Sequence, residues 1–126
     1  MDLCNRSDIQ ALLARHGFHF SKSMGQNFLI ESWVPAQIAD ASGADAGMGV
    51  LEIGPGIGPL TQQLAQRSGR VVSVELDRPL LPVLAETMAG FHNFPPVAGA
   101  ATKRDLRALP AEPFAGLRPR PCPNLA

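Results

Sequence analysis

VLEIGPGIGPLTQQLAQRSGRVVSVELD, residues Val50 to Asp77, is the stretch that decides the fold of this chain. Its first residues form a short apolar run with the length and β-branched character of a buried parallel strand. A glycine-rich turn follows, and Leu60 and Leu64 then stand at helical spacing. GRVVSVE supplies a second strand. Strand, turn, helix and strand in this order predict the opening of a doubly wound α/β sheet.

Helices are expected on both sides of this stretch. Ser7 can cap a helix that runs to about His16. A second helix begins near Ser32 and ends before the glycine-rich loop SGADAGMG. After the second strand, RPLLPVLAETMAG predicts one further helix, in which Pro79 is tolerated in the first turn and Pro82 fits less well.

The three glycines predict a ligand site at the carboxyl end of the first strand. Gly54, Gly56 and Gly58 allow a tight turn and a close approach of the backbone to a ligand. The dinucleotide fingerprint places its third glycine three residues after the second, and Pro59 stands there instead. Glu75 closes the second strand 21 residues after Gly54, near the offset of about 20 at which an acid reaches ribose hydroxyls.

A ligand that contains adenosine but no pyrophosphate fits this pattern best. S-adenosylmethionine has that chemistry, and it does not need the anion-binding loop of a dinucleotide site. Two alternatives stay open: a nicotinamide dinucleotide, and glycines that serve only a tight turn.

Composition limits the class of protein. The chain has 126 residues, 45% of them hydrophobic and 17% charged, which is typical of one globular domain. The 11 basic and 11 acidic residues give no overall attraction for a polyanion, so a nucleic acid would have to meet a local patch. Cys4 and Cys122 match no metal-ligand spacing and no disulfide framework. The N-terminus lacks the apolar core of a signal peptide, and we expect a cytoplasmic protein without a membrane segment.

The last 36 residues depart from this regular pattern. They hold seven of the 12 prolines, and a central strand with alternating prolines is physically implausible. RPRPCPNLA is therefore not expected to form a strand. We expect a solvated, partly disordered tail, and RNA contact is the alternative role for its five basic residues, Lys103, Arg104, Arg107, Arg118 and Arg120.

Four segments taken in order resemble the ribosomal small-subunit RNA adenine dimethyltransferases, the kasugamycin-resistance family. They are SKSMGQNFL, VLEIGPGIGPLT, VVSVELDRPLLPVL and FAGLRPRPCPNLA. The resemblance is dense over residues 16–94 and resumes at 114–125. It implies a Rossmann-like class I methyltransferase sheet, incomplete here because only the first strands and helices are present, with S-adenosylmethionine as cofactor.

The resemblance also implies an organisation in three parts. Residues 1–30 would form an N-terminal helix and a segment that contacts cofactor or RNA. Residues 31–94 would begin the methyltransferase domain, and residues 95–126 would be a proline-rich tail that ends in the catalytic motif. The helical C-terminal domain of the family is absent. The implied partner is small-subunit ribosomal RNA in a pre-ribosomal particle, and we expect a monomer.

The family match assigns the site residues. Asn27 and Leu29 match a segment that touches the cofactor, although GQNFL by itself is typical of an ordinary loop. Gly54 matches the cofactor-contacting glycine and Glu75 the ribose-binding acid. Asn124, from the family motif Asn-Leu-Pro-Tyr, would contact the cofactor and act in catalysis by orienting the target amine. No metal is implied.

His19 and Lys22 are weaker candidates for RNA contact, since an exposed, solvated face explains them better.

Two departures from the family pattern are visible in the sequence. Ala100 stands where the family has an aspartate that accepts a hydrogen bond from the cofactor adenine, and the loss of such a bond costs about 1.5–3 kcal/mol. Asn124 and Leu125 are followed by Ala126 rather than by Pro-Tyr. Two functions are therefore carried forward: an RNA adenine dimethyltransferase, and a truncated, inactive fragment that at most binds S-adenosylmethionine or RNA.

Overall fold

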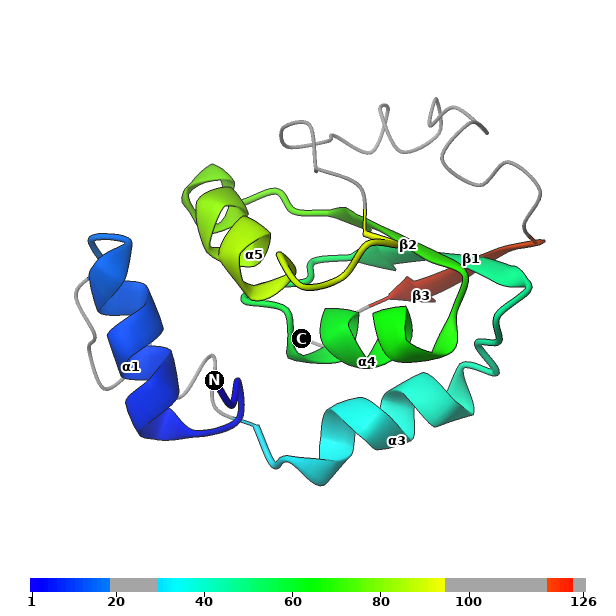
Figure 1. Cartoon of the computed structure of the whole chain (residues 1–126), viewed down its shortest axis with the longest axis horizontal. Coiled ribbons are helices and arrows are strands. Elements are labelled where there is room, and N and C mark those ends of the chain that lie inside the picture. The colour runs from blue at the N-terminus through cyan, green and yellow to red at the C-terminus, as the bar shows by residue number, and fades with distance from the viewer. Residues whose placement is uncertain (19–29, 95–117, 124–126) are drawn as a thin grey trace.

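The computed structural model describes residues 1–18 and 30–94, and the backbone of residues 118–123 (Figure 1). Among these residues, no helix is long and apolar enough to cross a membrane. The elements in chain order are α1 (Arg6–Arg15), α3 (Trp33–Ala41), β1 (Met48–Ile53), α4 (Pro59–Arg67), β2 (Arg70–Val74), the 3₁₀ turn η1 (Arg78–Leu80), α5 (Leu81–Thr87) and β3 (Arg118–Pro123).

The sheet has three described strands in the order β2-β1-β3, and both outer strands run parallel to β1. Val50 of β1 lies opposite Val71 of β2 and Arg120 of β3. Because α4 connects β1 to the parallel strand β2, these elements form a βαβ unit. The predicted α/β class with parallel strands is confirmed.

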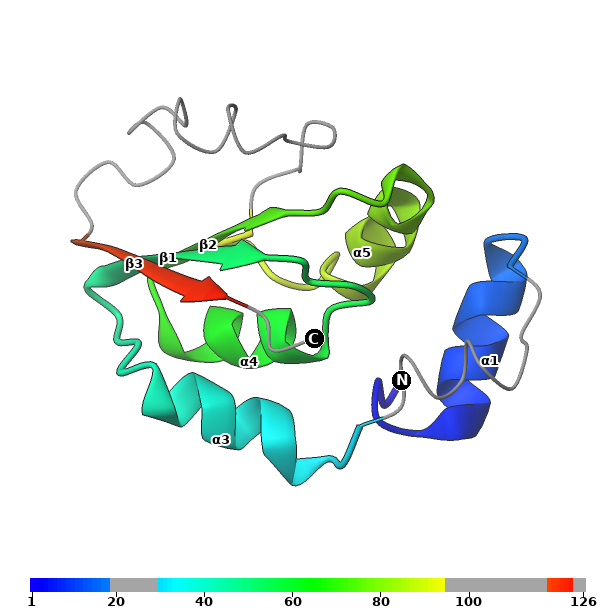
Figure 2. The same cartoon turned by 180° about the vertical axis from the view of Figure 1, so that it is seen from behind.

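The hydrophobic core has two parts. One lies between the sheet and the helices α3, α4 and α5, and its buried residues are Ala39, Val50, Leu60, Leu64, Ala65, Val71, Leu84 and Met88. In both views α3 and α4 lie on the same side of the sheet (Figures 1 and 2). The other part joins α1 to α5 and to the turn after β1, through Leu3, Ile9, Leu12, Leu13, Ile57, Leu80 and Val83.

The helix starts differ from the prediction in one place. Asn5, not Ser7, caps α1, because the Asn5 side chain accepts a hydrogen bond from the backbone N–H of Asp8 at 3.1 Å. The helix therefore already includes Ser7. The second helix starts after Ser32, as predicted.

The predicted helix after β2 is divided. Residues Arg78–Leu80 form the 3₁₀ turn η1, and α5 begins at Leu81. This division puts Pro79 in the first turn of η1 and Pro82 in the first turn of α5. Since a helix leaves its first N–H groups without intrahelical partners, neither proline removes a helical hydrogen bond.

The prediction that RPRPCPNLA forms no strand was wrong for residues Arg118–Pro123, which form β3 beside β1. The three prolines, Pro119, Pro121 and Pro123, occupy alternate positions, so their ring nitrogens all point to the same side of the strand. A ladder with β1 uses the backbone groups of the other three residues only. β3 is an edge strand of the described sheet, and an edge strand tolerates prolines on its outer side.

A carboxylic acid lies inside the core between β1 and α4. Glu52 is fully buried, and its Oε1 accepts hydrogen bonds from the hydroxyls of Thr61 (2.5 Å) and Ser73 (2.8 Å). Its Oε2 has no partner among the described residues. Burial raises the pKa of Glu52 to about 7, the two hydrogen bonds oppose this rise, and the charge of Glu75 adds to it.

The free energy of unfolding is expected to fall as the pH rises from about 4.5 to about 7, because the folded chain holds a proton on Glu52 that the unfolded chain has released. The loss is on the order of 3 kcal/mol at most. Urea titrations across this range measure it, and Glu52→Gln should remove this component of the pH dependence. Glu86→Gln is the control: the hydrogen bond from Arg15 lowers the pKa of the half-buried Glu86, so this carboxylate does not cause stability to fall as the pH rises. An unchanged pH profile in Glu52→Gln would contradict the assignment.

Candidate cofactor site

Three glycines in the left-handed backbone region connect β1 to α4. Their φ angles are +72° at Gly54, +62° at Gly56 and +102° at Gly58. A residue with a Cβ adopts this region at a cost of about 1–2 kcal/mol, which explains the glycines. The N–H of Gly54 donates to the carbonyl of Val74 at 2.8 Å, and thereby joins the loop to the end of β2. We call residues 54–58 the glycine loop.

The two ends of the glycine loop have different surroundings. A Cβ added at Gly54 would meet no heavy atom of the described residues within 4 Å. At Gly58 the same atom would lie 2.9 Å from Oγ1 of Thr87 and 3.1 Å from Cδ1 of Leu84. Among the described residues, the loop is therefore uncrowded beside its first glycine and packed against α5 at its last. Its uncrowded end follows the carboxyl end of β1, where open α/β sheets bind ligands.

Glu75 is the acid of this site. Its residue is 7% exposed, and its Oε1 accepts from the N–H of Gly56 at 2.8 Å while its Oε2 accepts from the N–H of Asp77 at 3.1 Å. Each carboxylate oxygen has two acceptor positions, so both oxygens can accept one more hydrogen bond. The structure thus brings the predicted residues Gly54 and Glu75 to the adjacent ends of β1 and β2.

Sequence analysis did not single out two residues of this region. Leu76 directly follows Glu75, and it is 61% exposed. Glu52, two residues before Gly54, is the buried acid described above. The signal that could have found Glu52 is an acid within the apolar strand sequence VLEI.

The other predicted site residues, Asn27, Leu29 and Asn124, lie outside the described residues, as do His19, Lys22 and Ala100. The described strand β3 ends at Pro123, which is opposite Ile53, the residue before Gly54. β3, which precedes Asn124 in the sequence, therefore ends where β1 ends, at the carboxyl ends of the strands, and the glycine loop begins there. The assignments of all these residues stay predictions.

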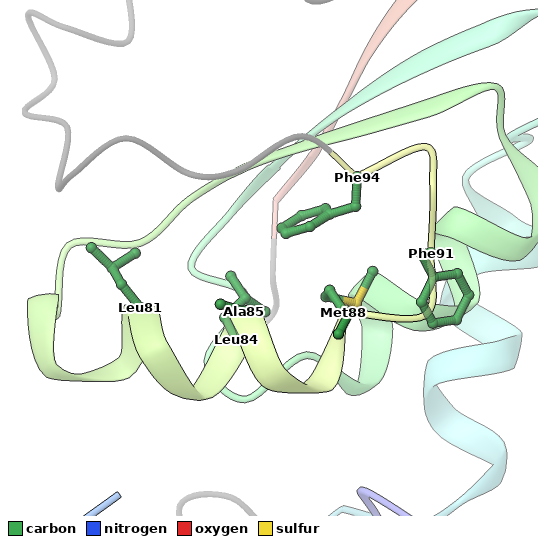
Figure 3. Close-up of a pocket in the computed structure, with 7 residues that line it drawn as sticks. Leu81, Leu84, Ala85, Met88, Phe91 and Phe94 are labelled. Carbon is green, nitrogen blue, oxygen red and sulfur yellow. The ribbon is translucent and has the colours of Figure 1, made fainter.

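A cavity of about 280 Å³ lies beside α5 (Figure 3). Among the described residues, its lining side chains are all apolar, namely those of Leu81, Leu84, Ala85, Met88, Ala89, Phe91 and Phe94. They offer no titratable group and no conventional hydrogen-bonding group. The cavity is therefore no candidate for catalysis.

Comparison with known proteins agrees with this geometry. The family model for ribosomal RNA adenine dimethylase matches residues 17–97. Ribosomal RNA small subunit methyltransferase A of Geobacillus thermodenitrificans is 44% identical over 119 residues, which is 94% of this chain and 41% of that protein. The protein of the same name from Staphylococcus aureus strain Newman is 50% identical over 92 residues, 73% of this chain and 31% of that protein. The chain thus spans about two fifths or less of these relatives.

Solved structures give the same fold. The crystal structure of the 23S rRNA methyltransferase ErmE superposes with a TM-score of 0.53 at 36% identity, over 57% of this chain and 29% of that one. A dimethyladenosine transferase from Plasmodium falciparum gives a TM-score of 0.51 at 25% identity, over 58% of this chain and 27% of that one. The sheet is therefore part of a Rossmann-like methyltransferase fold. From the match over residues 17–97, the chain belongs to the ribosomal RNA adenine dimethylase family.

Proposed function

We propose that the chain binds S-adenosylmethionine at the glycine loop and takes part in the dimethylation of adenine amines in small-subunit ribosomal RNA. The observation that carries this proposal is the position of the Glu75 carboxylate. Its Oε1 accepts a hydrogen bond from the N–H of Gly56 at 2.8 Å, and this holds the carboxylate beside the glycine loop at the carboxyl end of β1. The names of the relatives, ribosomal RNA small subunit methyltransferase A, support the substrate class.

The residues present fit this cofactor. Glu75 keeps one acceptor position on each oxygen, which matches the two hydroxyls of a ribose. Leu76 offers an exposed apolar side chain next to that acid, and a flat adenine ring can pack on such a surface. Asn27 and Leu29 would add contacts from the segment that precedes α3. The cofactor supplies a methyl group on a sulfonium, which is the group transferred.

The role proposed for Asn124 is to hold the target amine. The lone pair of an adenine amine is delocalised into the ring, so the amine is a poor nucleophile. An amide oxygen that accepts one of its hydrogens orients the nitrogen toward the methyl group. The base must first leave its stack to reach such a site.

The proposed setting follows from the substrate class. The partner is small-subunit ribosomal RNA in a pre-ribosomal particle, the protein acts as a monomer, and it works in the cytoplasm. Residues 1–30 would contact cofactor or RNA, residues 31–94 would carry the cofactor site, and residues 95–126 would end in the catalytic motif.

A second candidate function is binding without catalysis. Ala100 favours it, because a methyl side chain cannot accept the hydrogen bond that the family aspartate accepts from the cofactor adenine. The chain would then bind S-adenosylmethionine or RNA and transfer no methyl group.

Calorimetric titration of S-adenosylmethionine into the chain should give saturable binding. Glu75→Ala should weaken it at least about tenfold, because the carboxylate that accepts from the ribose and fixes the loop is lost. Glu86→Ala, which removes a half-buried carboxylate on α5 that pairs with Arg15, should bind like the unaltered chain. Equal affinities of Glu75→Ala and Glu86→Ala would overturn the assignment of the site.

Leu76→Ala should weaken cofactor binding about fivefold by reducing the apolar area that the adenine ring covers. Its melting temperature should stay unchanged, since the side chain is 61% exposed. Trp33→Ala is the matched control, because Trp33 is also 61% exposed and lies on α3. If both variants bind as the unaltered chain does, Leu76 has no part in the site.

Methyl transfer to undermethylated small-subunit RNA separates the two candidate functions. With labelled S-adenosylmethionine, the dimethyltransferase should label the RNA, and Glu75→Ala should label it much less. Cofactor binding without any labelling above the Glu75→Ala background would establish the second function and exclude the first.

A further inference from the structure

The last residue of α5, Thr87, contacts the end of the glycine loop at Ile57 and Gly58. Thr87 is buried, and its Oγ1 lies 2.8 Å from the carbonyl oxygen of Ile57 and 3.1 Å from that of Leu84. A hydroxyl has one proton to donate, and the carbonyl of Ile57 is the nearer acceptor. A loop carbonyl thus receives a hydrogen bond from a helix 30 residues further along the chain.

This hydrogen bond fixes a peptide group that is also held on its other side. The N–H of Gly58 donates to the carbonyl of Pro55 at 3.1 Å. Because the peptide bond between Ile57 and Gly58 is planar and trans, its C=O and N–H point in opposite directions. With Thr87 on one side and Pro55 on the other, this peptide plane cannot turn without losing a hydrogen bond.

Two further contacts tie the same residues together. The side-chain amide of Gln62, in the first turns of α4, donates to the backbone carbonyl of Thr87 at 2.9 Å. A Cβ at Gly58 would lie 2.9 Å from Oγ1 of Thr87, so the loop backbone packs directly on this side chain. The end of α5 therefore holds both the last residues of the glycine loop and the start of α4.

We propose that Thr87 is a positioning residue for the cofactor site, an inference that rests on the proposed function. Glycine has more backbone freedom than any other residue, so a loop with three left-handed glycines is held in one shape only by its contacts. The hydrogen bond from the N–H of Gly56 to the carboxylate of Glu75 fixes the middle of the loop, and the hydrogen bond from the hydroxyl of Thr87 to the carbonyl of Ile57 fixes its end. Without the Thr87 hydroxyl the loop is ordered less before binding, and cofactor binding must order it.

The test compares Thr87→Val, which keeps the shape and removes the hydroxyl, with Thr87→Ser, which keeps the hydroxyl. Thr87→Ala replaces the valine variant if the latter does not fold. Ser68→Ala is the matched control, because the buried Ser68 hydroxyl donates to the carbonyl of Leu64 at 2.7 Å at the opposite end of α4. Two quantities are measured: the Kd for S-adenosylmethionine, and the amide hydrogen exchange of the chain without ligand.

Thr87→Val should raise the Kd about fivefold. It should also accelerate exchange at the amides of Gly54, Gly56 and Gly58 more than at those of β2. Thr87→Ser should restore both values, and Ser68→Ala should change neither the Kd nor the loop amides selectively. A Kd unchanged by Thr87→Val, or exchange accelerated equally in the loop and in β2, would overturn the proposal, since Thr87 would then contribute only to overall stability.

The outcome for the unaltered chain separates this proposal from the one on which it rests. If that chain does not bind S-adenosylmethionine, the proposed function fails, and the exchange pattern alone decides whether Thr87 fixes the loop. If it binds and Thr87→Val binds equally well, the proposed function stands and the role of Thr87 is wrong.

Discussion

The hydrogen bond between the carboxylate of Glu75 and the N–H of Gly56 is the contact on which the candidate site depends. It links the end of β2 to a loop whose three glycines adopt left-handed φ angles. Because glycine has little conformational preference of its own, contacts must hold this loop in shape. The backbone bond from Gly54 to the carbonyl of Val74 makes the same link one step earlier. The acid and the loop consequently form one unit, and the geometry of one sets the geometry of the other.

Two buried polar side chains, Glu52 and Thr87, connect the strands and the glycine loop to the helices α4 and α5. Glu52 ties β1 to α4 and β2 through Thr61 and Ser73, and Thr87 ties the loop to α5. A fully buried carboxyl whose second oxygen has no partner in the described part of the chain is costly in an apolar core unless it stays protonated. The sheet thus carries an ionisable group, Glu52, only two residues before the first glycine of the loop, Gly54.

Local sequence signals predicted what depends on local geometry. Three closely spaced glycines between a strand pattern and a helix pattern predicted the turn after β1. The separation of 21 residues between Gly54 and Glu75 predicted that these two residues lie near each other at the ends of β1 and β2. The cap at Asn5 and the division of the helix between Leu80 and Leu81 were missed. Several nearby residues could act as the cap or as the first residue of the helix, and only the packing of the helix decides among them. Glu52 and Thr87 act through contacts between elements far apart in the sequence, which no local pattern reveals.

The failure to predict the strand β3 was the largest error. The prolines of β3 determine which hydrogen-bonding groups lie along its outer side. Each strand residue directs its N–H and C=O to one side, so Arg118, Arg120 and Cys122 form the ladder with β1 and the three prolines direct their backbone groups outward. Within Arg118–Pro123, the outer side of β3, which is an edge of the described sheet, presents carbonyl oxygens and no N–H group. Another strand could donate to it and would find no donor in return, so this edge is a poor template for adding a strand from a second molecule.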